Sequence, residues 1–322
     1  VALDQQRNVD SVRVANKTTM RFGSTIVDFG FFGVSRHVDH PIFQYLDYYA
    51  RDYGAFVRST DEWNLSGFRN RLVGGVNIHN GNIDTKQYIN NAGYKGALAA
   101  SMVDTSENYS AYAENSFYVL PDVAFVAGGQ FLYATRDRRD RFLSNGNQSG
   151  SRDYNIFSPK VGLLWDVDAT AQIFANISRS AEVPTYDSNS FSSPATSNVD
   201  AQIATTYEIG TRGNTADLTW DVSVYRAEIK DELQCLTTSP FSLCTVVNAD
   251  RTIHQGMEAG AGIAVLKSLF NTEDRVWFNT TYSFNDFSFD DDATFGNNEL
   301  PGVARHSIRL ETLYKHPDGL YA

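Results

Sequence analysis

The sequence predicts an all-β fold: a transmembrane antiparallel β-barrel built from up-and-down strands. Three observations lead to it. Apolar and polar residues alternate with a period of two, many alternating segments are long, and short and long connections take turns along the chain. Together they indicate about 13 to 14 strands.

The alternation is clearest in the segment LTWDVSV, 218–224. Leu218, Trp220 and Val222 fall on one face of an extended strand, and Asp221 falls on the other. The apolar phase becomes charged at Arg226, where we expect the strand to leave the bilayer. The same pattern recurs in the segments FSPKVGLLWD, TAQIFANIS, QIATTYEIGTR, VWFNTTYSFN and RHSIRLETLY.

Strand length and connection length favour a membrane barrel over a soluble sheet. Many alternating segments have about ten or more residues, whereas a soluble strand usually has about 5–6 and a membrane-spanning strand about 9–11. Short connections are expected near 120–122, 167–169, 213–216 and 316–319. Long polar connections are expected at 35–51, 80–106, 137–153, 181–201, 231–251 and 287–301. Short turns at one end and long loops at the other are typical of outer-membrane barrels.

The polar phase of the strands carries charges in mid-strand. Because a charged side chain on the lipid face costs about 2–4 kcal/mol at the midplane, these residues are expected to face a polar lumen. They are Glu114, Lys160, Glu208, Asp221 and Arg309.

Bulk properties exclude several other classes. The net charge of −11 argues against nucleic-acid binding, which needs a basic field. The chain has no apolar run of about 18 residues, so no transmembrane helix is expected. Its only cysteines, Cys235 and Cys244, are expected to form a local disulfide in an oxidising compartment.

Several segments resemble consecutive hairpins of TonB-dependent outer-membrane receptors: SRSAEVPTYD, TTYEIGTRG, WDVSVYRAEIKDEL and NADRTIHQGMEAG. DHPIFQYLD and RNRLVGGVN are similar to earlier segments of the same barrels. The resemblance covers most of the chain in the expected order. It implies a barrel of about 22 strands filled by an N-terminal plug domain.

The resemblance also implies a function. Residues 1–322 would be the β-barrel domain, with the plug, its TonB box and the C-terminal strands absent. The protein would be a receptor in the outer membrane of a Gram-negative bacterium, with lipid around it. It would take up a scarce small molecule, such as a ferric siderophore, using energy from the TonB complex through the plug. Neither a cofactor nor enzymatic activity is expected.

Candidate ligand contacts lie in polar segments at the rim. Arg138 and Arg139 belong to the charged run TRDRRDRF, where they are candidates for binding an anionic ligand. Tyr186 and Phe191 belong to the loop TYDSNSFSSPATSNVD, and loops at the mouth of a barrel often carry ligand contacts.

Three alternatives stay open at the level of sequence. The first is a passive porin-like channel, and the second is a soluble β-rich carbohydrate-binding protein. The third, a barrel-borne hydrolase, requires a Ser/His/Asp cluster at one rim, and no nucleophile-elbow motif is present. His37 and His40 offer two ligands in a polar segment, which do not make a metal site on their own.

Overall fold

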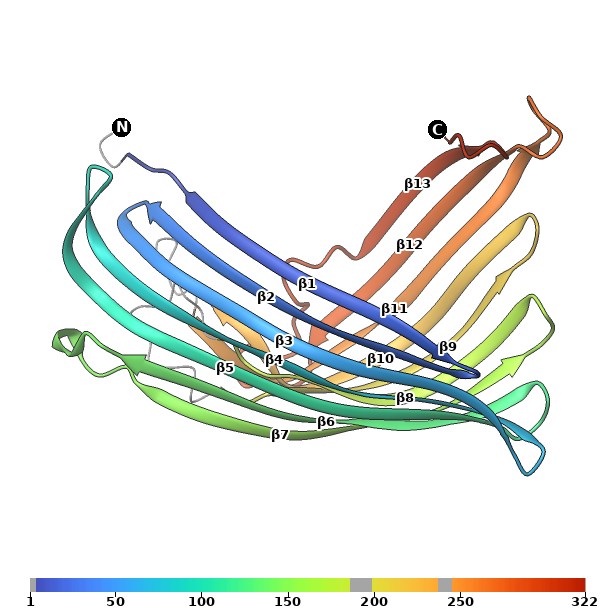
Figure 1. Ribbon diagram of the computed structural model, residues 1–322, viewed down its shortest axis with the longest axis horizontal. Coiled ribbons are helices and arrows are strands. Elements are labelled where there is room, and N and C mark those ends of the chain that lie inside the picture. The colour runs from blue at the N-terminus through green and yellow to red at the C-terminus, as the bar shows by residue number, and fades with distance from the viewer. Residues whose placement is uncertain (1–3, 186–198, 237–244, 322) are drawn as a thin grey trace.

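A computed structural model describes residues 4–185, 199–236 and 245–321. In it the chain forms one 13-stranded antiparallel sheet whose strands follow each other in chain order. The sheet is strongly curled into an open trough, shown in Figure 1. Within the described residues β1 and β13 are the two edges and do not pair with each other. The predicted fold class, an up-and-down sheet of about 13 strands, is confirmed.

The strands are β1 (Asn8–Phe22), β2 (Thr25–Pro41), β3 (Gln44–Leu65), β4 (Phe68–Asn91), β5 (Tyr94–Tyr118), β6 (Val123–Asp140), β7 (Gly150–Asp166), β8 (Ala171–Glu182), β9 (Gln202–Asn214), β10 (Leu218–Leu236), β11 (Thr245–Lys267), β12 (Arg275–Phe289) and β13 (His306–Lys315). One 3₁₀ turn, η1 (Leu143–Asn145), lies between β6 and β7. No helix in the described part of the chain has the length and hydropathy of a membrane span.

The register aligns side chains of one kind into rows across neighbouring strands. Val224 on β10 is opposite Ile209 on β9 and Met257 on β11. On the same face, Leu163 on β7 is opposite Phe125 on β6. We call this apolar face the outer face, and the opposite face, which carries the mid-strand charges, the inner face. Because side chains alternate between faces, each strand contributes to both.

The two ends of the sheet differ. At the turn end the connections 23–24, 66–67, 119–122, 167–170, 215–217 and 268–274 are short. At the other end, the loop end, the strands extend well beyond a membrane-spanning length: β3, β4 and β5 have 22, 24 and 25 residues. A span needs only about 9–11 residues.

Two predicted loops are strands in the structure. Segments 35–51 and 80–106 continue the ladders of β2, β3, β4 and β5 up to tight turns at 42–43 and 92–93. The prediction of long loops there was wrong because it relied on apolar alternation. Beyond the bilayer both faces of a hairpin contact water, so the apolar phase disappears while the backbone ladder continues.

Buried apolar residues form small clusters near the loop end rather than one central core. Ala134, Tyr154 and Ile156 pack together on the inner face against Val183 and Ile203. Large apolar side chains are instead exposed on the outer face. Examples are Phe31, Val57, Phe125, Phe131, Leu163, Ile209 and Val224. An extensive exposed apolar surface of this kind indicates contact with lipid.

Candidate functional site

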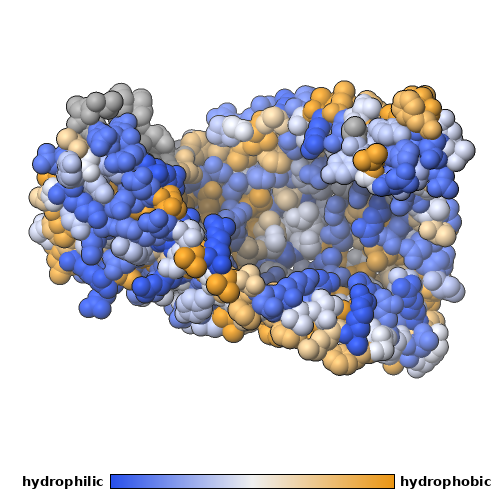
Figure 2. Space-filling model, turned by 45° about the horizontal axis from the view of Figure 1, so that its top comes forward, coloured by the Kyte–Doolittle hydropathy of each residue, from blue (hydrophilic) through white to orange (hydrophobic). Residues whose placement is uncertain are grey.

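A polar cavity of about 690 Å³ lies on the inner face near the turn end. Figure 2 looks into the hollow of the molecule that contains it. The cavity lining includes four of the predicted lumen residues: Glu114, Lys160, Glu208 and Asp221. The fifth, Arg309, is an exposed residue on β13, opposite the lining residue Thr281.

Some of the charged side chains in this cavity have polar partners on nearby strands. Lys160 Nζ donates to Glu114 Oε2 at 2.8 Å, and Asn176 Nδ2 donates to Glu208 Oε2 at 2.8 Å. The Lys160 and Glu114 side chains keep 42% and 37% of their surface exposed. Partly solvated pairs of this kind are weak, so they can exchange partners with water or with a passing ligand.

A second pocket of about 440 Å³ lies on the inner face near the loop end. We call it the mouth pocket; its lining includes Arg36, Asp52, His79, Asn108 and Arg136. Within the part of the chain that the structure describes, Arg36 Nε is buried and has no hydrogen-bond partner. Arg136 is held in place, donating from Nε to the Pro184 carbonyl oxygen at 2.8 Å and from Nη2 to Asn108 Oδ1 at 3.0 Å. Two guanidinium groups over a concave surface suit an anionic ligand.

The predicted ligand residues have different environments. Arg138 is buried and bonded to Asp104, with Nε–Oδ1 and Nη2–Oδ2 distances of 2.7 and 2.9 Å. Arg139 is exposed and lies on the outer face, in the same phase as Phe131. The structure therefore places neither arginine on the mouth pocket. Tyr186 and Phe191 lie outside the described residues.

Sequence reasoning missed Arg36 and Arg136. Both sit in strand extensions whose two faces are polar, so the sequence pattern does not show which side chains point inward. Arg36 is an even number of residues from the inner-face residue Phe32 on β2, and Arg136 is an even number from Gln130 on β6. Alternation would therefore place both arginines on the inner face, but only if one knows that the strands continue that far.

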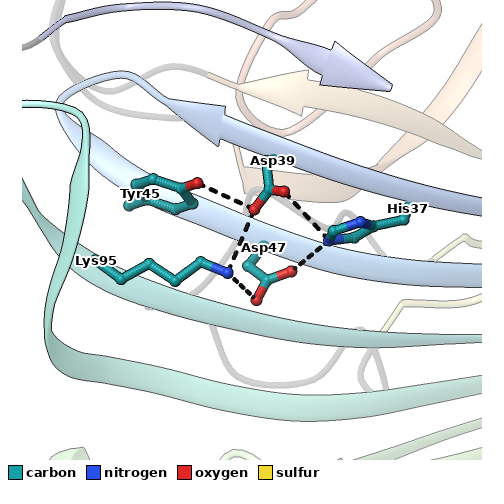
Figure 3. A network of polar contacts seen from close by, with 5 residues as sticks. All are labelled: His37, Asp39, Tyr45, Asp47 and Lys95. Carbon is teal, nitrogen blue, oxygen red and sulfur yellow. Dashed lines mark hydrogen bonds and ion pairs between the residues drawn. The ribbon is translucent and has the colours of Figure 1, made fainter. Parts of the chain in front are cut away.

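A separate polar network, drawn in Figure 3, joins β2, β3 and β5 close to the loop end. His37 Nε2 is 3.0 Å from Asp47 Oδ1 and 3.5 Å from Asp39 Oδ2. Lys95 Nζ lies 2.7 Å from Asp47 Oδ2 and 3.3 Å from Asp39 Oδ1. The Tyr45 hydroxyl donates to Asp39 Oδ1 at 3.1 Å. We call these five residues the rim network.

The rim network is on the outer face, beyond the stretch of about ten residues with which each strand crosses the bilayer. His37 has the parity of Phe31 on β2, and its ring stacks on Tyr49 with centroids 4.0 Å apart. His40 has the opposite parity, and its Nδ1 contacts the Gln6 carbonyl oxygen at 2.7 Å. The two histidines therefore do not form a pair.

The electrostatics of the rim network favour an internal salt bridge. Burial raises the pKa of Asp47, but the hydrogen bonds from Lys95 and His37 outweigh it and hold that pKa below its usual value. Burial lowers the pKa of Lys95, but Asp47 and Asp39 outweigh it and hold the ammonium charged. Ligand atoms of His37, Asp39 and Asp47 lie within 4.8 Å of one another. A metal ion would have to displace the Lys95 ammonium, which already pairs with both carboxylates.

Cys235 lies in β10, one residue before the strand ends, and is disulfide-bonded. Cys244 lies outside the described residues, so the pairing of the two cysteines stays a prediction.

A comparison with protein families decides the assignment. The family model described as "TonB dependent receptor-like, beta-barrel" matches residues 3–321. The chain belongs to this family. No curated protein sequence matches this TonB-dependent receptor barrel.

Solved structures show the same fold at low sequence identity. The ferric citrate transporter FecA in its unliganded form is 13% identical, with a TM-score of 0.74, and the match covers 97% of this chain and 47% of FecA. The pyoverdine receptor FpvA from Pseudomonas aeruginosa PAO1, bound to pyoverdine, is 14% identical with a TM-score of 0.73, covering 97% and 49%. The copper transporter OprC is 14% identical with a TM-score of 0.73, covering 98% and 51%.

This TonB-dependent receptor barrel thus spans about half the length of these solved structures. The family lies in the outer membrane of Gram-negative bacteria, and its members are receptors and transporters rather than enzymes. The chain therefore forms part of an outer-membrane β-barrel. The assignment disfavours the soluble carbohydrate-binding protein, the passive channel and the hydrolase.

Proposed function

We propose that the protein containing this barrel imports a ferric siderophore across the outer membrane, in a transport cycle driven by the TonB complex through a plug domain. The observation that carries the choice of ligand is the mouth pocket. It places the Arg36 and Arg136 guanidinium groups on the inner face, at the end where such barrels have their extracellular loops.

Charge separates this ligand class from its main competitor. FecA is named for ferric citrate and FpvA for pyoverdine, whereas OprC is named for copper. Arg36 and Arg136 disfavour an uncomplexed copper ion because, of the two carboxylates in the lining, Asp104 is already paired with Arg138, which leaves Asp52 to offset two guanidinium charges. A chelate that surrounds iron with carboxylate, catecholate or hydroxamate oxygens presents acceptors to both guanidinium groups.

The inner face offers a path below this pocket. The cavity near the turn end is lined by side chains in weak, solvated pairs such as Lys160 with Glu114. A polar ligand can replace such pairs one at a time without leaving a buried charge unpaired. The role of this face in our proposal is passage, with no covalent chemistry.

The test uses the full-length gene in its own host. We expect its deletion to abolish ⁵⁵Fe uptake with one member of a panel of ferric citrate, hydroxamates and catecholates, and to leave copper uptake unchanged. Uptake should return with the wild-type gene and should disappear again when TonB is removed. Uptake that persists without TonB would establish a passive channel instead.

A point variant connects the uptake to the mouth pocket. Arg36→Ala should raise the siderophore concentration for half-maximal uptake about tenfold or more, because a charge-assisted hydrogen bond contributes about 1.5–3 kcal/mol. Arg139→Ala is the matched control, since Arg139 lies on the outer face, and it should leave uptake unchanged. Equal uptake by the Arg36 variant and the wild type would remove the mouth pocket from the proposal.

A further inference from the structure

The β2–β3 hairpin brings one histidine and two carboxylates together on the outer face, within the rim network. Asp39 on β2 is directly opposite Asp47 on β3, and His37 precedes Asp39 by two residues, on the same face. Like charges directly opposite each other in a sheet are destabilising, so this pair of carboxylates favours a cation nearby. Strand pairing alone therefore makes three potential metal ligands converge.

The spacing of the three donor atoms suits a small tetrahedral cation. His37 Nε2 is 3.0 Å from Asp47 Oδ1 and 3.5 Å from Asp39 Oδ2. Zn²⁺ binds imidazole nitrogen and carboxylate oxygen at about 2.0–2.2 Å, so two ligands of a tetrahedral Zn²⁺ ion are about 3.3–3.6 Å apart. In the described part of the chain, no other group of three His, Cys, Asp or Glu side chains brings its donor atoms within 4.8 Å of one another.

The imidazole of His37 is already oriented for this role. Its ring stacks on Tyr49, with centroids 4.0 Å apart and planes 3° apart. Figure 3 shows its Nε2 directed at both carboxylates. A metal ion would take the place of a proton on Nε2, and the neutral ring would keep its proton on Nδ1. The side chains of His37 and Asp47 are 23% and 10% exposed, so the donors are partly desolvated but reachable from water.

The Lys95 ammonium lies on the other side of the two carboxylates. It contacts Asp47 Oδ2 and Asp39 Oδ1, whereas the imidazole faces Asp47 Oδ1 and Asp39 Oδ2. A metal ion bound to the oxygens that face the imidazole would therefore lie beside the ammonium and repel it. Lys95 can leave because its side chain is 38% exposed and a partly solvated ion pair is weak.

We propose that His37, Asp39 and Asp47 form a Zn²⁺ site at the loop end, and that Zn²⁺ bound there releases Lys95 and so uncouples the β4–β5 hairpin from the β2–β3 hairpin. Three protein ligands and one water complete the coordination that Zn²⁺ prefers. Ca²⁺ and Mg²⁺ take about six or more oxygen ligands, which this site does not supply. The site is on the outer face, so it does not depend on which ligand the receptor transports.

The experiment is isothermal titration calorimetry of the full-length, untagged receptor in detergent, with ZnCl₂ as the probe. His37→Phe, which keeps a ring against Tyr49, and Asp39→Asn should each weaken the binding of one Zn²⁺ about tenfold or more, because even a hydrogen-bond partner of a ligand contributes that much. Lys95→Met should tighten it about threefold or more, since no ammonium competes. His40→Ala is the matched control: His40 is three residues from His37 but has the opposite parity, and its loss should leave this binding unchanged.

Amide hydrogen exchange reports the uncoupling of the hairpins. Adding Zn²⁺ to the wild type should speed exchange at the turn 92–93, because the β4–β5 hairpin loses the contact of Lys95 with the neighbouring hairpin. Exchange at the turn 42–43 should not become faster with Zn²⁺, since the metal ion bridges β2 and β3. In Lys95→Met the hairpins are uncoupled before Zn²⁺ is added, so exchange at 92–93 should not change further.

Each outcome bears on the site. Equal Zn²⁺ affinity in the wild type and His37→Phe would overturn it, and Lys95→Met that binds no more tightly than the wild type would overturn the competition with the ammonium. Ca²⁺ binding as tight as that of Zn²⁺ would overturn the choice of metal. Circular dichroism and the heat-dependent gel mobility of the barrel check that each variant is folded. The gain of affinity in Lys95→Met is a result that misfolding does not produce.

Discussion

Arg138 and Asp104 form a bidentate ion pair between β6 and β5, with Nε–Oδ1 and Nη2–Oδ2 distances of 2.7 and 2.9 Å. Their side chains are only 2% and 4% exposed. The pair lies on the inner face near the loop end, next to the mouth pocket that Asp104 helps to line. The two parallel hydrogen bonds hold both side chains in one geometry. Arg138 therefore stabilises the β5–β6 wall beside the mouth pocket, and its charge is already engaged by Asp104.

Removing one partner of this pair should destabilise the barrel strongly. We expect Asp104→Ala to lower the free energy of unfolding by about 3–5 kcal/mol, because it removes the bidentate carboxylate partner of a buried guanidinium. Urea unfolding in detergent micelles, followed by tryptophan fluorescence, measures this. Arg139→Ala, one residue along the chain from Arg138 but exposed, should change stability by no more than about 0.5 kcal/mol. Similar losses in the two variants would contradict the pairing.

The rim network should make the tips of the β2–β3 and β4–β5 hairpins sensitive to pH. The pKa of Asp47 is held below its usual value, so its contribution to stability is present above the unfolded-state pKa of about 3.9 and is lost as pH falls through the folded value. The pKa of Lys95 is raised, so its contribution is present below about 10.4 and is lost as pH rises through the folded value.

Amide hydrogen exchange at the turns 42–43 and 92–93, corrected for its intrinsic pH dependence, tests the pH range over which the rim network stabilises the hairpins. Protection should be constant near neutral pH and fall at both extremes. Lys95→Met should remove most of the protection at neutral pH and flatten its pH dependence. A wild-type profile that matches that of the Lys95 variant would show that the network does not fasten the hairpins together.

Alternation in the sequence was sufficient to assign faces within the bilayer. Val222 and Asp221 could be assigned to opposite faces because lipid and water impose opposite costs on successive residues. The same reasoning placed Glu114 and Lys160 on the inner face, where they line the cavity. It could not show that Lys160 donates to Glu114, because that contact depends on the register of β5, β6 and β7.

Beyond the bilayer the sequence lost its predictive value for a physical reason. Both faces of the extended hairpins contact water, so apolar and polar residues need not alternate there. Without that alternation the sequence shows neither that the strand continues nor which way its side chains point. Arg138 and its partner Asp104 are 34 residues apart, and their contact follows only from the long β5–β6 ladder. The rim network likewise needs Lys95, which comes 48 residues after Asp47.

The cysteine pair gives a direct chemical test. Cys235 is disulfide-bonded, and we expect peptide mapping without reductant to show it joined to Cys244. Closing a loop of this length contributes about 2–3 kcal/mol in the chain-entropy model. Cys235→Ser should therefore speed hydrogen exchange at the end of β10, while exchange at the turn end stays unchanged. Maleimide labelling of both thiols in receptor taken from intact outer membranes would exclude the bond.

The two faces of the barrel should differ sharply in their tolerance of the same new charge. Val222 lies on the outer face within the apolar band of β10, so Val222→Arg should cost about 2–4 kcal/mol of folding free energy. Ser283 on β12 lines the inner cavity directly opposite Glu258, so Ser283→Arg gains a counter-charge and water and should cost less than about 1 kcal/mol. Reversible unfolding in lipid vesicles compares the two variants. A larger loss for Ser283→Arg than for Val222→Arg would reverse the assignment of inner and outer faces, and with it the placement of the cavity on the inner face.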